Sequence, residues 1–182
     1  MPKSTAIKAG YAKKLGGVDF DLYPQIRHLL SLFIADQEIK KMVNKEDLRY
    51  LEAFWNSDED IVNLLVELAT KYRMTIWNVE ESDRSIHFGN EVVGVIREDG
   101  KNDEDLYIRS ACDKIIHAER IIFDVTKLRG IHDHYLNPFI HINGKRGKRK
   151  WEVIIDILSF CNALCRPVQK TFEELTSGSK SE

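Results

Sequence analysis

Apolar residues recur at the three- and four-residue spacing of an amphipathic helix in three segments of the first half of the chain. The first helix is expected to begin near Pro24, because proline is favoured in an opening turn. A second is expected from Asn44, and a third from Ser57, where Asp60 completes a capping-box pattern. Together these segments predict a helical bundle. The apolar positions that define the three helices are Ile26, Leu29, Leu30, Phe33 and Ile34, then Leu48, Leu51 and Trp55, then Ile61, Leu64, Leu65 and Leu68.

The pattern changes in the middle of the chain, where "SIHFGNEVVGVI" carries β-branched residues on both sides of "GNE". This predicts a short β-hairpin. A helix is expected from Asp103 to Val125, followed by a loop and a short strand at Phe139–Ile142. A final helix is expected to stop at Pro167, and it would carry Trp151, Ile154, Ile155, Leu158, Cys161 and Leu164. The predicted fold is mainly α, with a small β element inserted.

The composition of the chain predicts a globular protein with a single domain. Of the 182 residues, 43% are hydrophobic and 31% charged, which is typical of a folded globular chain. We expect a flexible arm over residues 1–18, a single helical domain over 19–168 and a disordered tail over 169–182, because no repeat or linker divides the middle. The net charge of −2 means that an anionic partner would need a local basic patch.

The three cysteines are Cys112, Cys161 and Cys165. An odd number with this spacing argues against a disulfide framework and favours a reducing compartment. No apolar run approaches the length of a membrane span, and the N-terminal residues lack the apolar core of a secretory signal. We therefore expect a cytoplasmic protein with packing, non-nucleophilic cysteines and no membrane association.

The stretch "DLYIRSACDKIIHAERIIFDV" divides into an apolar and a polar face when it is read as a helix. Arg109, Asp113 and His117 follow one another at steps of four on the polar face, and Glu119 projects into the apolar face. One interpretation is a solvated face with alternating charges. Glu119 then indicates that the helix ends or kinks nearby, or that the surrounding surface is wet.

The alternative interpretation is a catalytic site. The Asp113 carboxylate could orient His117 as a general acid and base, and Arg109 could stabilise a negatively charged transition state. A guanidinium beside an imidazole suits cleavage of an RNA phosphodiester and needs no metal or other cofactor. The residues alone leave the two interpretations open.

"IRSACDKIIHA" resembles the motif of the HEPN superfamily, an arginine followed by a histidine on a late helix with a polar residue between. That resemblance implies an HEPN-like helical bundle and a homodimer that brings two motifs together. It also implies a metal-independent endoribonuclease of a toxin–antitoxin or phage-defence system, with Arg109, Asp113 and His117 in the matching roles. An antitoxin or a defence complex would be the protein partner. Here seven residues separate Arg109 from His117, whereas the usual gap is four to six.

The segment "GKRGKRK" concentrates five basic residues just before the expected final helix. It is either a solvated loop or a loop that contacts an RNA backbone. The RNA-binding candidates are Lys145, Arg146, Lys148, Arg149 and Lys150.

Three histidines, His132, His134 and His141, could suggest a metal site, but no metal-binding motif accompanies them, so a surface role is favoured and no metal is expected. The leading function is thus a ribonuclease or ribonuclease-like effector. The alternative is a non-catalytic helical module that binds a protein or associates with nucleic acid.

Overall fold

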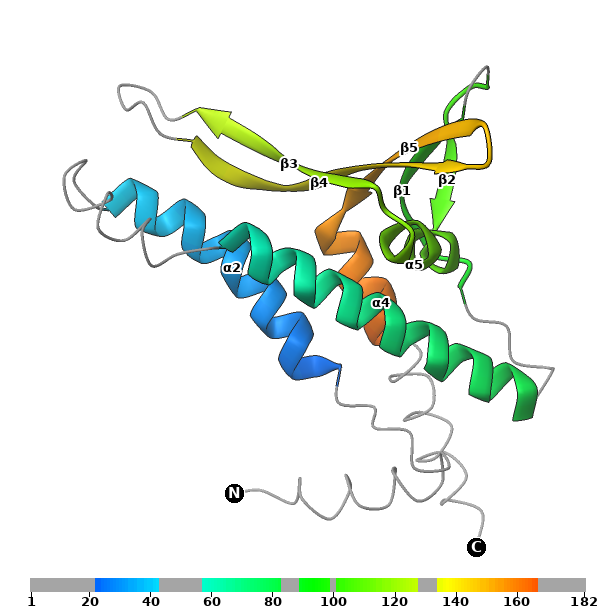
Figure 1. Ribbon diagram of the computed structural model, residues 1–182. Coiled ribbons are helices and arrows are strands. Elements are labelled where there is room, and N and C mark those ends of the chain that lie inside the picture. Colours follow the sequence, from blue (N-terminus) through cyan, green and yellow to red (C-terminus); the bar gives the residue numbers. More distant parts are fainter. Residues whose placement is uncertain (1–21, 43–56, 83–88, 99–100, 128–133, 167–182) are drawn as a thin grey trace, which may run out of the picture.

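The chain forms an antiparallel β-sheet with helices packed against one of its faces (Figure 1). The computed structural model describes residues 22–42, 57–82, 89–98, 101–127 and 134–166. The described strands are β1 (Val92–Glu98), β2 (Glu104–Tyr107), β3 (Arg120–Lys127), β4 (His134–Arg146) and β5 (Arg149–Asp156). The described helices are α2 (Tyr23–Met42), α4 (Ser57–Ser82), α5 (Ile108–Ile116) and a helix over residues 157–166.

The prediction of a mainly α, HEPN-like helical bundle is therefore wrong, because five strands form the centre of an α/β fold. The predicted arm over residues 1–18 and tail over 169–182 lie outside the described residues. So does the whole of the helix expected from Asn44 through Trp55.

Two of the predicted helices are confirmed. Helix α2 begins at Tyr23, one residue before Pro24, and α4 begins at Ser57 with three acidic residues in its first turn. Acidic side chains there interact favourably with the helix dipole. In α4, all four apolar positions expected on the inner face are buried. In α2, Ile34 is 62% exposed, so its apolar face is narrower than predicted.

The sheet has the strand order β2-β1-β5-β4-β3. Strands β1 and β2 form one antiparallel pair, and β3, β4 and β5 form an antiparallel meander. The two parts join where β1 pairs with β5. Helix α5 connects the edge strand β2 with the opposite edge strand β3, so the chain crosses the helical side of the sheet at this point (Figure 1).

The helix expected from Asp103 to Val125 is wrong, because strand β2, helix α5 and strand β3 share that span. Only the nine residues of α5 are helical, and their apolar face is confirmed by buried Ile108, Ala111, Cys112 and Ile115. The run "RIIFDVTK" that follows is rich in β-branched residues, which fit a pleated surface better than a helix.

The predicted final helix is also wrong in its first half, since residues 149–156 form β5 and the helix starts at residue 157. The expected short strand Phe139–Ile142 is part of the much longer β4. Strand β1 confirms the β character of "EVVGVI", and its described partners are β2 and β5. The first arm of the predicted hairpin, residues 85–88, lies outside the described residues.

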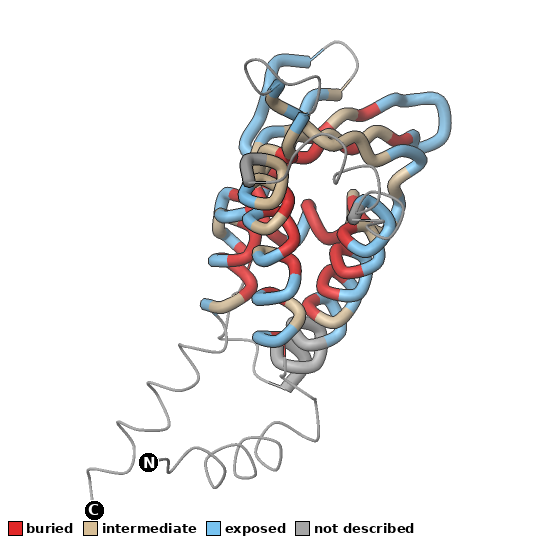
Figure 2. The backbone as a smooth tube through the Cα atoms, turned by 90° about the vertical axis from the view of Figure 1, so that its left-hand side faces the viewer, coloured by how far each residue is buried: buried red, intermediate tan, exposed pale blue. Residues whose placement is uncertain are grey.

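The hydrophobic core lies between the sheet and the helices, and Figure 2 shows the buried positions on the facing sides of both. Alternate residues of β5, namely Trp151, Val153 and Ile155, point into it. Asp36 on α2 is a buried charged residue in this region, and its carboxylate accepts a hydrogen bond from the Leu136 backbone N–H at 2.7 Å. Lys40 Nζ pairs with the same carboxylate at 2.8 Å, so the charge is compensated.

Candidate functional site

Helix α5 carries two of the three residues predicted to be catalytic, and His117 follows its last residue. Arg109 is exposed in the first turn, and Asp113 is half-buried one turn later. His117 is the exposed C-cap residue, whose backbone N–H donates to the Asp113 carbonyl oxygen at 3.1 Å. The three residues therefore share one short segment, but His117 is not on the continuous helical stripe that the sequence predicted.

The Asp113 carboxylate pairs with Arg73 of α4, with 3.0 Å between Oδ1 and Nη1. The two side chains are 50% and 42% exposed, so water screens the pair and it adds little stability. The contact links α5 to α4 instead of orienting the His117 ring. The catalytic roles of Arg109, Asp113 and His117 thus remain predictions. The ion pair with Arg73 supports the other interpretation, in which Asp113 belongs to a solvated, charged helix surface.

Glu119 shows why the apolar face of the predicted helix was interrupted. The helix ends before it, as one of the interpretations of this residue required, and its exposed carboxylate pairs with Lys145 Nζ at 3.1 Å. The Glu119 backbone N–H also donates to the Asn143 carbonyl oxygen of β4. Glu119 therefore marks the start of the sheet's β3–β4 pairing and contacts the basic segment.

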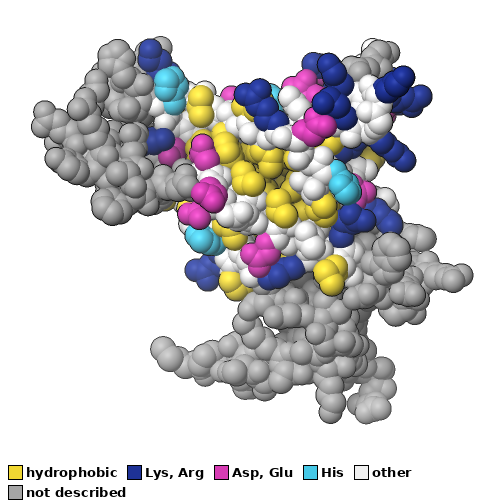
Figure 3. Space-filling view, in the orientation of Figure 1, with side chains coloured by type: hydrophobic (Ala, Val, Ile, Leu, Met, Phe, Trp, Pro, Cys, Tyr) yellow, Lys and Arg dark blue, Asp and Glu magenta, His cyan; other side chains and the backbone are white. Residues whose placement is uncertain are grey.

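The five basic residues predicted to contact RNA lie at the tip of the β4–β5 hairpin and are all exposed. The cross-strand register places Lys145 opposite Lys150 and Arg146 opposite Arg149. Directly opposed like charges destabilise an antiparallel pair. Lys148 adds a further positive charge in the turn. Figure 3 shows the resulting group of Lys and Arg side chains at this end of the sheet. We call Lys145, Arg146, Lys148, Arg149 and Lys150 the basic hairpin tip.

Gly147 makes the two-residue turn of this hairpin possible. Its φ of 64° lies in the left-handed region, and Lys148 after it has no positive φ. Glycine in the first central position is typical of a type II′ turn, whose twist matches that of the flanking strands. A tight turn of this kind gives the five charges defined positions that a mobile loop would not provide.

Trp151 anchors the base of the hairpin. Its indole is only 6% exposed and lies against Gly144 on the neighbouring strand. Lys114 Nζ of α5 lies 4.4 Å from the ring centroid, a cation–π contact. Burial lowers the pKa of Lys114, Glu98 raises it and the nearby Arg146 lowers it again. The hairpin and α5 are thus joined by an aromatic contact.

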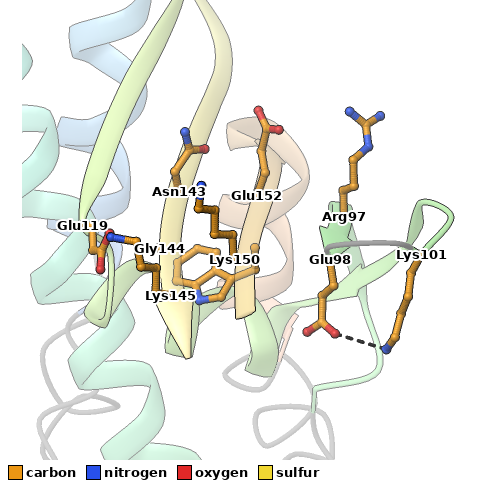
Figure 4. A pocket seen from close by; sticks show the side chains of 10 residues that line it. Arg97, Glu98, Lys101, Glu119, Asn143, Gly144, Lys145, Lys150 and Glu152 are labelled. Carbon is orange, nitrogen blue, oxygen red and sulfur yellow. Dashed lines mark hydrogen bonds and ion pairs between the residues drawn. The ribbon is translucent and has the colours of Figure 1, made fainter. Parts of the chain in front are cut away.

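A pocket of about 450 Å³ adjoins the base of the hairpin (Figure 4). Each of three cations around it has an acidic partner within 3.1 Å, in the pairs Lys145–Glu119, Lys101–Glu98 and Arg97–Asp103. A hydrogen bond from Lys101 lowers the pKa of Glu98, and the two from Arg97 lower the pKa of Asp103. The pocket is therefore nearly neutral, and the excess positive charge lies beside it. Its lining residues are Arg97, Glu98, Lys101, Glu119, Asn143, Gly144, Lys145, Lys150, Trp151 and Glu152.

The sequence interpretation missed Trp151 and Lys114 as parts of this site. Trp151 was expected on the final helix, whereas it lies on strand β5, where it is buried. The alternation of Lys150, Trp151, Glu152 and Val153 is the period-two signal that predicts a half-buried strand, and it could have revealed the hairpin. No comparable signal links Lys114 to Trp151, because the contact depends on the crossover of α5.

The three histidines do not form a described metal site. His132 lies outside the described residues, while His134 and His141 lie seven positions apart on β4. His141 Nδ1 lies 3.9 Å from Glu152 Oε1 on β5. Within the described parts of the chain, no group of three or more His, Cys, Asp or Glu residues could hold a metal ion.

Comparison of the chain with protein-family models, curated proteins and solved structures found no match in any of the three. Of the helices in the described ranges, none is both long and apolar enough to cross a lipid bilayer.

Proposed function

We propose that the protein binds RNA through the phosphate backbone, with the basic hairpin tip as the contact surface. The observation that carries this proposal is the pairing of Lys145 with Lys150 and of Arg146 with Arg149 across adjacent rungs of one hairpin. Each rung opposes like charges, and Glu119, 3.1 Å from Lys145 Nζ, offsets part of the resulting repulsion in the free protein. A row of phosphates between the side chains would replace this repulsion by attraction.

The chemistry of the tip favours contact with phosphates over recognition of bases. Arginine and lysine at the tip can bind phosphate oxygens, and none of its five side chains is an asparagine or glutamine that could recognise adenine; the nearest along the chain is Asn143, which lines the adjoining pocket. Binding is therefore expected to depend little on sequence and strongly on salt. With about four effective phosphate contacts, affinity for single-stranded RNA should fall roughly 50-fold between 50 and 200 mM salt.

The test measures binding of a labelled single-stranded RNA 20-mer by fluorescence anisotropy, with double-stranded RNA and both forms of DNA as further arms. Arg149→Gln should weaken RNA binding about fivefold and should slightly raise the free energy of unfolding, because it removes one like-charge pair. Lys127→Gln is the matched control, since it removes one exposed positive charge from the end of β3 that lies away from the basic hairpin tip.

If Arg149→Gln makes the protein more stable but weakens RNA binding, the charge at this position serves binding and not folding. Equal effects of Arg149→Gln and Lys127→Gln, or no binding of RNA at 50 mM salt, would contradict the proposal. Tighter binding of either DNA form than of RNA would reassign the substrate.

Cleavage of RNA by Arg109 and His117 in a toxin or phage-defence system remains a separate prediction. The same RNA, incubated with the protein in EDTA, tests it. A loss of cleavage in His117→Ala with unchanged anisotropy would support an enzyme, whereas intact RNA with both proteins supports a non-catalytic RNA-binding module. The proposed location is the cytoplasm, in keeping with the free thiols of Cys112, Cys161 and Cys165.

A further inference from the structure

Strand β3 is an edge strand with unusual exposure. It stands last in the strand order, and among the described elements only β4 packs extensively on it. None of its residues is fully buried, although Ile121 and Phe123 contact the core and Val125 is 47% exposed. Figure 3, seen from the β3 side, shows hydrophobic side chains at the surface between the sheet and α4.

The two edges of the sheet differ in a way that matters for association. Strand β2 at one edge has only four residues, of which Glu104 and Asp105 are exposed acids. Short length and charge are common protections of an edge against pairing with another chain. Strand β3 has eight residues with four large apolar side chains, and its outer backbone groups have no β-partner among the described strands. Its length and apolar content leave it less protected than β2, although it carries Arg120, Asp124 and Lys127 and its pairing with β4 shifts register between Phe123 and Val125.

We propose that β3 pairs antiparallel with β3 of a second copy, so that two sheets join into one across a two-fold axis at Ile122. In such a pair every contact occurs twice: if residue i of one copy faces residue j of the other, residue j of the first copy also faces residue i of the second. An axis at Ile122 places Arg120 opposite Asp124 of the second copy, twice. It also places Ile121 opposite Phe123, and Ile122 opposite itself. Each rung between residues 120 and 124 then joins opposite charges or two apolar side chains, while Val125 to Lys127 extend past the start of the partner strand.

The strand's charge pattern selects this register over the neighbouring one. Moving the two-fold axis to Phe123 would place Ile122 opposite Asp124, twice, and Arg120 opposite Thr126, so that neither charge meets an opposite one. Asp124 also accepts a hydrogen bond from Asn137 Nδ2 of β4 at 2.9 Å, an uncharged donor that leaves the negative charge of the carboxylate in place. A second copy of the chain is therefore the partner whose charges fit this edge.

The experiment measures the dimer dissociation constant of the full chain by sedimentation equilibrium. The wild type should dimerise in the micromolar range, and Ile122→Lys should raise the dissociation constant at least tenfold because two lysines would meet at the axis. Val95→Lys is the matched control, since Val95 is 38% exposed on β1, away from the edge. Arg120→Asp should weaken the dimer as much as Ile122→Lys, and adding Asp124→Arg to it should restore the dimer.

A cross-link keeps the test independent of these charged variants. Ile122→Cys should form an intermolecular disulfide under mild oxidation, because residues facing each other across a two-fold β-pair lie within disulfide reach. Val95→Cys should not. A wild type that stays monomeric at 200 µM would overturn the proposal. So would a dimer that survives Ile122→Lys, or one that is lost in Val95→Lys instead, which would assign the contact to the open face of the sheet.

Discussion

At position 144 the β4 backbone passes so close to the Trp151 indole that a side chain would overlap the ring. Gly144→Ala must displace the indole from its buried position. We expect a loss of about 1–3 kcal/mol in the free energy of unfolding, measured by urea denaturation.

The control for Gly144→Ala is a double-mutant cycle with Trp151→Leu, which shortens the side chain at the contact. In that background the alanine should cost much less, because the overlapping atoms are gone. Equal costs in both backgrounds would mean that the backbone conformation at residue 144, and not the indole, requires glycine.

The three thiols should differ in reactivity. Cys112 and Cys161 are buried, and burial raises the pKa of both, that of Cys161 to about 12. Burial also raises the pKa of Cys165, but this side chain is only partly covered. Because the thiolate is the reactive form, we expect one thiol to react with a disulfide reagent in the native protein at pH 8, with a rate that increases up to pH 9 and above. Three should react after unfolding.

Cys165→Ser provides the control for the thiol experiment. It should remove the native reaction and leave two thiols that react only in denaturant. A fast reaction that persists in this variant would contradict the burial of Cys112 or Cys161.

At the scale of elements, the attachment of α2 to the sheet depends on Asp36. Its carboxylate satisfies the Leu136 backbone N–H of β4 and balances the charge of Lys40. Asp36→Ala leaves both groups without this partner, and we expect a loss of about 2–4 kcal/mol, measured by thermal and urea unfolding.

Asp36→Asn separates the hydrogen bond from the charge. It keeps an acceptor for the Leu136 N–H, so it should cost clearly less than alanine. Lys40→Met should cost less than Asp36→Ala too, since Lys40 is the more exposed partner of the pair. If all three variants are equally stable, the contact does not hold α2 to β4.

The sequence predicted elements correctly where local periodicity was sufficient. The apolar spacing of α2 and α4 runs over many turns, so no neighbouring element could blur it. Strand β5 and the helix over residues 157–166 follow each other without a turn, and Ile154, Ile155 and Leu158 happen to fall at helical spacing across the junction. Periodicity alone then merges a strand and a helix into one helix.

The sequence predicted the part of the candidate site that depends on local composition, but not the part that depends on strand register and helix packing. The concentration of charge in residues 144–150 was visible as composition, and the structure places all five basic residues together. Their arrangement as opposed like charges depends on the β4–β5 register, which a one-residue shift would change. The pairing of Asp113 with Arg73 depends on the packing of α5 on α4 and has no local signal.

For the whole molecule, the β3 pairing and the basic hairpin tip predict cooperation between two copies. The hairpins of a joined sheet would point toward opposite ends, with their tips roughly 40 Å apart from strand rise and spacing. A 30-nucleotide RNA can reach both tips, whereas a 6-nucleotide RNA reaches one. We therefore expect the ratio of the two affinities to be at least tenfold larger for the wild type than for Ile122→Lys.

Anisotropy titrations at equal salt provide this measurement, and Val95→Lys should behave as the wild type. If the ratio is unchanged in Ile122→Lys, the dimer does not contribute to RNA binding, and each hairpin tip binds RNA independently. A longer RNA offers more binding positions to any protein. Because this factor is the same for the wild type and the variant, it cancels when their ratios are compared.

The pairing of β1 with β5 has a consequence for how the chain acquires its structure during synthesis. Gly94 and Ile155 are partners, although about sixty residues separate them along the chain, so the contact order of the sheet is high. The β1–β2 hairpin leaves the ribosome long before its neighbour exists, and an isolated hairpin is at most marginally stable. Until residues 149–156 emerge, β1 exposes an unpaired edge in a crowded cell. Nascent chains paused before that point should therefore recruit chaperones and be cut by proteases, whereas those released after it should resist both.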